Sequence, residues 1–197
     1  MKKLLTSLAL LPVLASCSGA SVSSLNLPLQ ERLRNPLVAE RYWSDMAEHM
    51  ADYTRTEDPI MKDGLKAGIV EGERVRALER VAQARTLKKG GISGVFLTPT
   101  THESVDGEVL LRENTLSFGT TFSTIPNPSI HIFLTTVVDP RDVPFPDKSS
   151  IDVGELQTAY GPQTYVIPQE KIVPGIRTAV LYDTRLSRII GFAQLSK

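Results

Sequence analysis

The chain has 197 residues, 41% of them hydrophobic, and its 22 Lys and Arg residues are balanced by 22 Asp and Glu residues. A formal net charge of zero provides no strongly basic surface, which argues against a nucleic-acid-binding protein. A single cysteine cannot pair within the chain, so the folded part must be held by packing rather than by disulfide bonds.

Residues 1–16 have the composition of a secretory signal. Lys2 and Lys3 come first, a mostly apolar run over residues 4–14 follows, and the small residues Ala15 and Ser16 end the segment. This order of charged, apolar and small residues is typical of a signal peptide. The apolar run is well short of the ~20 residues that cross a bilayer, so we do not expect a stable transmembrane helix here.

The lone cysteine, Cys17, stands directly after this segment. Leu14, Ala15, Ser16 and Cys17 together resemble the bacterial lipoprotein box, an aliphatic residue and two small residues before a cysteine. The resemblance implies cleavage between Ser16 and Cys17, a diacylglycerol on the Cys17 thiol and an acyl group such as palmitate on the new amino terminus. The alternative is an ordinary signal peptide with a free cysteine. Ser18, where an aspartate would favour the inner membrane, favours outer-membrane residence.

Two helices are expected after a polar segment. Residues 17–34 are read as the lipidated cysteine and a flexible, Ser-rich tether. Asn35-Pro36 and Asp58-Pro59 each combine an N-cap residue with a proline suited to the first helical position. The second helix is expected to end at Gly90. Residues 35–90 therefore predict a helical hairpin, whose first apolar face repeats at helical spacing through Ala39, Tyr42, Trp43, Met46, Met50 and Tyr53.

Three glycines recur at four-residue spacing in the second expected helix. Gly64, Gly68 and Gly72 would form a smooth stripe, although each costs roughly 1 kcal/mol relative to alanine inside a helix. Two interpretations remain open. The stripe packs tightly against the helix that carries Trp43, or the helix bends near Gly72.

The hydrophobic pattern changes after Gly91 from helical to alternating. Short runs of β-branched, aromatic and leucine residues are separated by Pro, Gly, Asn and Asp over residues 91–197. Many short strands of this kind indicate an antiparallel sandwich or barrel, and we expect a β-sandwich, which gives an α+β protein overall. Residues 139–147, DPRDVPFPD, are too rich in proline for a central strand and are expected to form a surface loop.

The β-rich half resembles the DM13 domain, a module of extracellular and envelope proteins that is often described as an electron-transfer domain. The resemblance runs from about Gly94 to Leu195 and is strongest in DVGELQTAYGPQTYVIP, residues 152–168. Matching positions there are Gly154, Leu156, Gly161, Gln163, Tyr165 and Pro168; the opening pattern matches Gly94, Phe96, His102 and Gly107.

One position departs from the family pattern. The closing strand of DM13 domains typically carries a cysteine after an aromatic residue, and that thiol motivates the redox role. Here the aromatic residue is Tyr182 and Asp183 follows it. An aspartate can bind a hard cation, but it provides no thiolate or disulfide chemistry. The substitution leaves the fold expectation intact and weakens the expectation of electron transfer.

Candidate functional residues are few. His49 has no metal-ligating residue four positions along its helix and is read as structural. His102, His131, Tyr165, Tyr182 and Asp183 are the candidates for a ligand site or pocket, and a mixed nitrogen and oxygen metal site from the histidines and Asp183 stays open. The sequence has no G-x-S-x-G elbow, phosphate loop, dinucleotide fingerprint, zinc spacing or haem-attachment motif, so we do not expect an enzyme.

The sequence thus predicts a lipid-anchored protein of the bacterial cell envelope, in the outer membrane and facing the periplasm or the cell surface. Its DM13-like domain is expected to act as a non-catalytic binding or accessory module for an unknown envelope protein or small ligand. The alternative is a redox or metal-binding protein, as the DM13 resemblance implies. No cofactor is expected, with haem or a metal ion as the open alternative.

Overall fold

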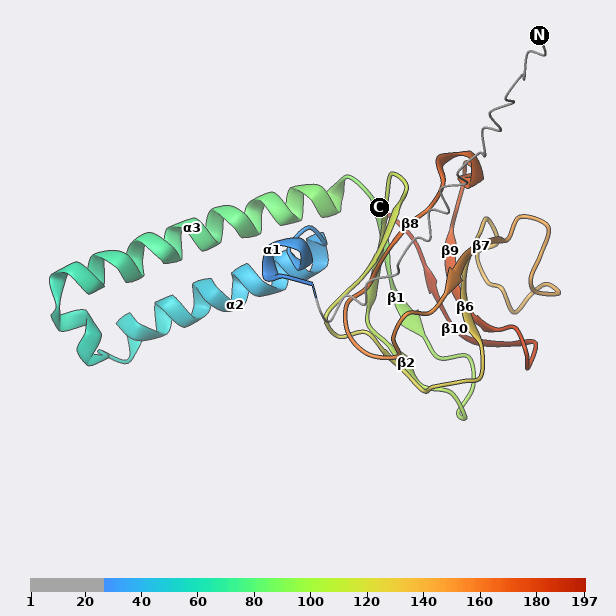
Figure 1. Cartoon of the computed structure of the whole chain (residues 1–197), viewed down its shortest axis with the longest axis horizontal. Coiled ribbons are helices and arrows are strands. Elements are labelled where there is room, and N and C mark those ends of the chain that lie inside the picture. Colours follow the sequence, from blue (N-terminus) through green and yellow to red (C-terminus); the bar gives the residue numbers. More distant parts are fainter. Residues whose placement is uncertain (1–26) are drawn as a thin grey trace, which may run out of the picture.

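The computed structural model describes residues 27–197 and combines a long helical hairpin with a β domain. The hairpin projects from one end of the β domain, and a short helix lies between the two (Figure 1). The predictions for the signal peptide, for Cys17 and for the first part of the tether lie outside the described residues. No helix within residues 27–197 is long and apolar enough to cross a membrane.

Five helical segments and ten strands follow one another along the described residues. The helical segments are α1 (Leu29–Arg32), α2 (Pro36–Arg55), η2 (Pro59–Lys62), α3 (Gly64–Lys89) and η3 (Gln169–Lys171). The strands are β1 (Ile92–Leu97), β2 (Val105–Asp106), β3 (Glu108–Arg112), β4 (Thr115–Phe118), β5 (Ser123–Thr124), β6 (Ile130–Thr135), β7 (Ile151–Glu155), β8 (Thr164–Val166), β9 (Thr178–Asp183) and β10 (Arg188–Gln194).

The tether was expected to run to residue 34, but its last part is helical. Helix α1 spans Leu29–Arg32, and the carbonyl of Pro28 accepts hydrogen bonds from the amides of Glu31 and Arg32. Proline is favourable immediately before or at a helix start because its φ angle is already fixed near the helical value. The described chain therefore enters the fold several residues before Asn35.

Helix α2 begins where the sequence predicts. The Asn35 side chain accepts a hydrogen bond from the amide of Leu37 at 3.0 Å, and Pro36 occupies the first helical position. The Asn35 side-chain amide also donates to the carbonyl of Phe118 at 2.9 Å. One residue thus caps the helix and joins the hairpin to β4.

The second long helix begins later than predicted. Asp58-Pro59 starts the 3₁₀ helix η2, and Asp63 then caps α3 by accepting hydrogen bonds from the amides of Leu65 and Lys66. A second N-cap residue five positions on offers a new start, so the chain turns between the two helices before α3 extends. The end is as predicted, since Gly90 closes α3 and Lys88 and Lys89 lie in its last turn.

The glycine stripe does not mediate close packing. A Cβ atom added at Gly64, Gly68 or Gly72 would meet no atom within 4 Å, so the tight-packing interpretation is wrong. Helix α3 instead contacts α2 through a different face, on which Val70, Ala77, Val81 and Ala84 are buried. The glycines lie on the open side of α3.

Eight strands form one antiparallel sheet that curls until it is nearly closed into a barrel. The order is β7-β6-β9-β10-β1-β3-β4-β8, and a separate two-stranded ribbon joins β2 and β5. The predicted sandwich of two packed sheets is not confirmed. Strand β1 explains the difference, because its residues 92–95 pair with β3 while Phe96 and Leu97 pair with β10. A side chain at Gly94 would lie 2.2 Å from the carbonyl oxygen of Gln194, so glycine permits this approach.

Strand alternation separates an interior from an outer face. On β6, Ile130, Ile132 and Leu134 belong to the main core, whereas Phe133 belongs to a second apolar cluster. The main core includes large side chains that are almost completely buried, such as Phe118 and Phe122. Because alternate residues of a strand point to opposite faces, the second cluster lies outside the barrel and requires a separate cover.

Candidate functional site

The second apolar cluster covers the outer face of β6, β9 and β10. Its buried members are Phe133, Val180, Tyr182 and Phe192, and the partly buried Phe145 and Ile189 pack against them. Phe145 comes from the loop of residues 139–147, which the sequence predicts as a surface loop. This loop therefore contributes an aromatic side chain to the sheet surface.

Three aromatic rings of this cluster contact one another edge to face. The ring centroids are 5.7 Å apart for Phe133 and Phe145, 5.8 Å for Phe133 and Tyr182, and 5.3 Å for Phe145 and Tyr182. These distances are typical of favourable aromatic pairs. We call Phe133, Phe145 and Tyr182 the aromatic triad.

The far end of the covering loop is held by the Asp147 carboxylate. It accepts hydrogen bonds from the hydroxyls of Thr135 at 2.8 Å, Ser149 at 2.7 Å and Ser150 at 2.5 Å. Burial would raise the pKa of Asp147, but these hydrogen bonds and one from the Ser149 amide hold it well below its usual range. Asp147 therefore stays ionised and keeps Phe145 in place near neutral pH.

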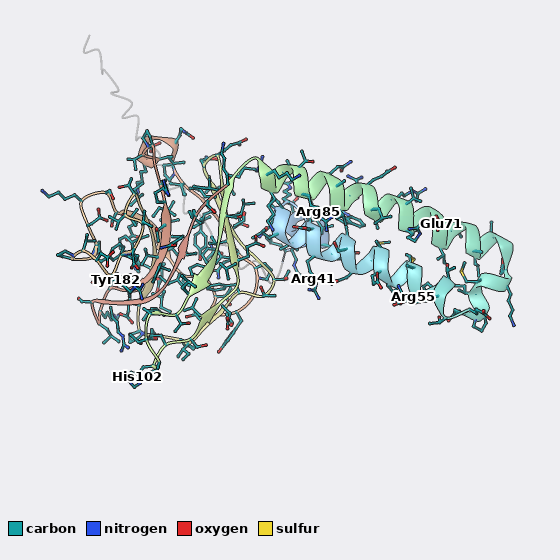
Figure 2. The ribbon with its side chains drawn as sticks, turned by 180° about the vertical axis from the view of Figure 1, so that it is seen from behind. Arg41, Arg55, Glu71, Arg85, His102 and Tyr182 are labelled. Atoms are coloured by element: carbon teal, nitrogen blue, oxygen red, sulfur yellow. The ribbon has the colours of Figure 1, made fainter. Side chains whose placement is uncertain are left out.

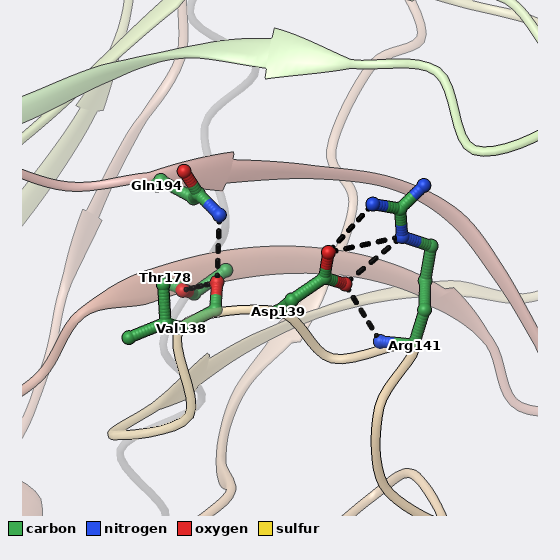
Figure 3. A network of polar contacts seen from close by, with 5 residues as sticks. All are labelled: Val138, Asp139, Arg141, Thr178 and Gln194. Carbon is green, nitrogen blue, oxygen red and sulfur yellow. Dashed lines mark hydrogen bonds and ion pairs between the residues drawn. The ribbon is translucent and has the colours of Figure 1, made fainter.

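The near end of the loop is held by two polar contacts and an ion pair (Figure 3). The Val138 carbonyl accepts hydrogen bonds from the Thr178 hydroxyl at 2.9 Å and the Gln194 side chain at 3.2 Å. Asp139 accepts from the Arg141 Nη2 at 2.6 Å, and this hydrogen bond lowers the pKa of Asp139. The Arg141 guanidinium in turn lies 5.1 Å from the centre of the Phe192 ring, a cation–π geometry.

A groove of about 380 Å³ opens beside the aromatic triad. Its walls include Phe145 and Tyr182, and two guanidinium groups, those of Arg141 and Arg188, also line it. Arg188 forms an ion pair with the Glu103 carboxylate at 3.0 Å, and the Glu103 side chain is only 5% exposed. Arg188 also donates a hydrogen bond to the Thr100 hydroxyl at 3.2 Å. We call this feature the Tyr182 groove.

The structure places His131 on the same outer face as Tyr182. The two residues are direct partners in the antiparallel ladder of β6 and β9, and the His131 ring lies 6.5 Å from that of Phe133. His131 Nδ1 is 3.0 Å from Asp152 Oδ2 on β7. His131 thus borders the aromatic triad, although it does not line the groove.

Asp183 lies beside Tyr182 in sequence but on the opposite face of β9. It is completely buried, and its Oδ1 accepts hydrogen bonds from the amides of Arg185 at 2.8 Å and Leu186 at 2.9 Å. Its Oδ2 accepts from the Ser129 amide at 3.4 Å. Backbone amides therefore surround this carboxylate, which organises the turn between β9 and β10.

The other two candidates lie elsewhere. Tyr165 is buried in the barrel, where its hydroxyl donates to Gln163 Oε1 at 2.5 Å and accepts from the Gln157 amide at 2.9 Å, and burial raises its pKa well above the usual range. His102 is exposed on a loop of the β domain, whereas Tyr182 lies on the sheet (Figure 2). The structure thus brings two of the five candidates, His131 and Tyr182, to one surface.

Several groove residues could not be found from the sequence. Phe145, Arg141 and Arg188 stand in a loop or at a strand end and follow no motif. The available signal was a phenylalanine between prolines in a loop expected to face solvent, because an aromatic side chain there needs an apolar surface to cover. Within residues 27–197, no three His, Cys, Asp or Glu side chains gather into a group that could hold a metal ion.

Comparisons with known proteins identify the β domain. Neither curated proteins nor solved structures gave a match to the chain. The family model described as electron transfer DM13 matches residues 97–195, which include the Tyr182 groove and every strand from β2 to β10. The chain therefore belongs to the DM13 family.

Proposed function

We propose that this protein is a lipid-anchored envelope lipoprotein whose DM13 domain acts as a non-catalytic binding module. The observation that carries the proposal is the Tyr182 groove, in which an aromatic wall and two guanidinium groups meet on the outer face of the sheet. The occupant is a partner protein or small ligand that offers an apolar group flanked by a carboxylate.

The composition of the groove supports binding rather than packing alone. Its volume lies within the range of roughly 300–1,000 Å³ that is usual for ligand pockets. Aromatic and arginine side chains are enriched at binding hot spots because they offer large contact areas together with directional donors. The covering loop is held at both ends, so Phe145 and Arg141 are positioned before a partner arrives.

The anchor is proposed from the sequence, through the Leu14 to Cys17 pattern. A lipid on Cys17 would hold the helical hairpin and the DM13 domain at the outer membrane, with the partner in the periplasm or at the cell surface. Substitution Cys17→Ala should abolish labelling of the protein by radioactive palmitate in cells. Labelling that persists in this variant would refute the lipid anchor.

Capture from envelope extracts tests the groove. The full chain should retain a partner, and Phe145→Ala should weaken that capture at least about tenfold because a buried aromatic contact is lost. The matched control is Tyr160→Ala, which removes an aromatic side chain that is 60% exposed and makes no ring contact within residues 27–197. Equal capture of the partner by the Phe145→Ala and Tyr160→Ala variants would contradict binding at the Tyr182 groove.

The second candidate function is electron transfer, which the description of the family favours. In that case Tyr182 and His131, which lie on one surface, would act with haem or a metal ion in place of a thiol. Of the other ligand candidates, His102 lies on a separate loop, and both oxygens of Asp183 already accept hydrogen bonds from backbone amides. A visible absorption spectrum and a metal analysis of the protein purified from the envelope distinguish the two functions. A stoichiometric haem, copper or iron would favour electron transfer, whereas a colourless and metal-free protein would contradict it.

A further inference from the structure

A larger cavity, of about 890 Å³, shares no lining residue with the Tyr182 groove. It is bounded by α1 and the start of α2 on one side and by the outward face of β3, β4 and β8 on the other. Figure 1 shows α1 at the end of the hairpin that is nearest the β domain. Glu31 and Arg32 of α1 line the cavity. We call it the α1 cavity.

Two arginines of the α1 cavity have more donors than partners. The Nε atom of Arg32 is buried and has no hydrogen-bond partner, and its side chain forms no ion pair within residues 27–197. Arg112 has only a 3.6 Å contact with Glu113, which is 75% exposed. A buried guanidinium donor without an acceptor is unfavourable, so an acceptor from outside the chain is the natural partner.

The acidic lining of the cavity does not neutralise these charges. Glu31 is its one acidic residue among the described side chains, and it pairs with Arg34 at 2.9 Å. Both of these side chains are substantially exposed, at 41% and 77%. Arg32 has no acidic partner within residues 27–197, and Arg112 has only its ion pair with the exposed Glu113, so the cavity keeps a local excess of positive charge.

Three hydroxyl groups from the sheet line the same space. Thr115 and Ser117 belong to β4, and Thr164 belongs to β8. Ser117 is 2% exposed, and none of the three hydroxyls makes a hydrogen bond within the described part of the chain. Hydroxyls can donate to an anion, so they extend the donor set of the two arginines.

We infer that the α1 cavity binds the phosphate group of a small, partly apolar molecule. A phosphomonoester carries a charge of about −1.5 to −2 and three terminal oxygens, which suits two guanidinium groups and several hydroxyls better than a carboxylate with one charge does. Leu110 and Val38 provide apolar walls for the rest of the molecule.

The cavity also gives the hairpin a function. Arg32 and α1 precede the residues matched by the DM13 family, whereas Arg112, Ser117 and Thr164 lie within them. Helix α1 and the start of α2 therefore complete a site that the DM13 domain alone would not form. This site is separate from the Tyr182 groove and does not depend on its role.

Titration calorimetry of the full chain in neutral detergent tests the inference. Inorganic phosphate and glycerol 3-phosphate represent a soluble source, and detergent micelles containing phosphatidic acid, compared with micelles containing diacylglycerol, represent a lipid headgroup. Binding of either source supports the phosphate site and identifies which source fits. Failure of both, or acetate binding as tightly as phosphate, would overturn it.

Variants place the binding in the α1 cavity. Arg32→Gln and Arg112→Gln should each weaken phosphate binding at least about tenfold, because each removes a charged donor. Arg41→Gln is the matched control, since Arg41 lies on α2 and pairs with Asp45 away from the cavity. Circular dichroism confirms folding; should an arginine variant misfold, Ser117→Ala should still weaken binding. Wild-type affinity in the folded cavity variants would contradict the assignment.

Discussion

At the level of single residues, Asp183 has a structural role that could not be inferred from the residues next to it in the sequence. Its carboxylate accepts hydrogen bonds from three backbone amides and is completely buried. Removing such an acceptor leaves buried donors without partners, which is more costly than losing an exposed hydrogen bond. The residue therefore holds the β9–β10 turn and the start of β6 together.

Substitution Asp183→Ala should accordingly reduce the free energy of unfolding by about 2–3 kcal/mol. Asp183→Asn, which keeps an acceptor oxygen, should lose less. Denaturant unfolding monitored by circular dichroism measures both, with the exposed Asp142→Ala as a control expected within about 0.5 kcal/mol of wild type. A neutral Asp183→Ala would show that the carboxylate has no structural role.

The face of the sheet on which a residue lies could be predicted from the sequence wherever strand alternation determines it. His131 stands between Ile130 and Ile132 in the sequence, so alternation predicts it on the opposite face from them, and the ladder places it beside Tyr182 on the outer face. Phe145 and Arg188 could not be placed, because their contacts depend on how a loop folds back and on which strands are neighbours. Local spacing contains neither kind of information.

At the level of elements, an ionic bridge fixes the hairpin to the β domain. Lys88 at the end of α3 lies 2.7 Å from Glu108 on β3 and 3.5 Å from Glu40 on α2, and Arg85 lies 2.9 Å from Glu40. Figure 2 shows Arg85 on the hairpin close to the β domain. Burial would raise the pKa of Glu40, but the Arg85 hydrogen bond and the Lys88 charge together lower it.

Lys88→Met should destabilise the protein by about 1 kcal/mol at neutral pH, since these charges are only partly exposed. The folded-state pKa of Glu40 is lower than its unfolded value, so its contribution is present above the unfolded pKa and is lost as the pH falls through the folded one. The difference between wild type and Lys88→Met should therefore shrink from about pH 5 toward pH 3. Chemical unfolding of both proteins at several pH values measures this difference in the free energy of unfolding. A difference that stays constant with pH would contradict the ionic bridge.

Helix boundaries were predictable to the extent that their caps are local. Asn35-Pro36 and Gly90 mark real ends, because an N-cap side chain and a C-terminal glycine act within one turn. Asp58-Pro59 marked a 3₁₀ turn instead, since Asp63 offers a second cap before α3. The glycine stripe was misjudged because spacing shows which residues share a face but not what covers that face.

At the level of the whole molecule, strand content was predictable and strand order was not. Alternating runs after Gly91 indicated many antiparallel strands, and the described chain has them. The near-closure of one sheet depends on β1 pairing with β3 and β10 along successive parts of its length. Such long-range pairing leaves no periodic signal, so a sandwich and a barrel could not be distinguished.

We propose that the DM13 domain binds a partner at the Tyr182 groove, and photo-crosslinking in cells tests this proposal most directly. A photoreactive residue replaces Thr100, which lines the groove, or Glu170, which is exposed on η3 and outside the groove. We predict a discrete adduct from position 100 that Phe145→Ala abolishes, and no such adduct from position 170. Identical adducts from both positions, or none from position 100, would contradict the claim.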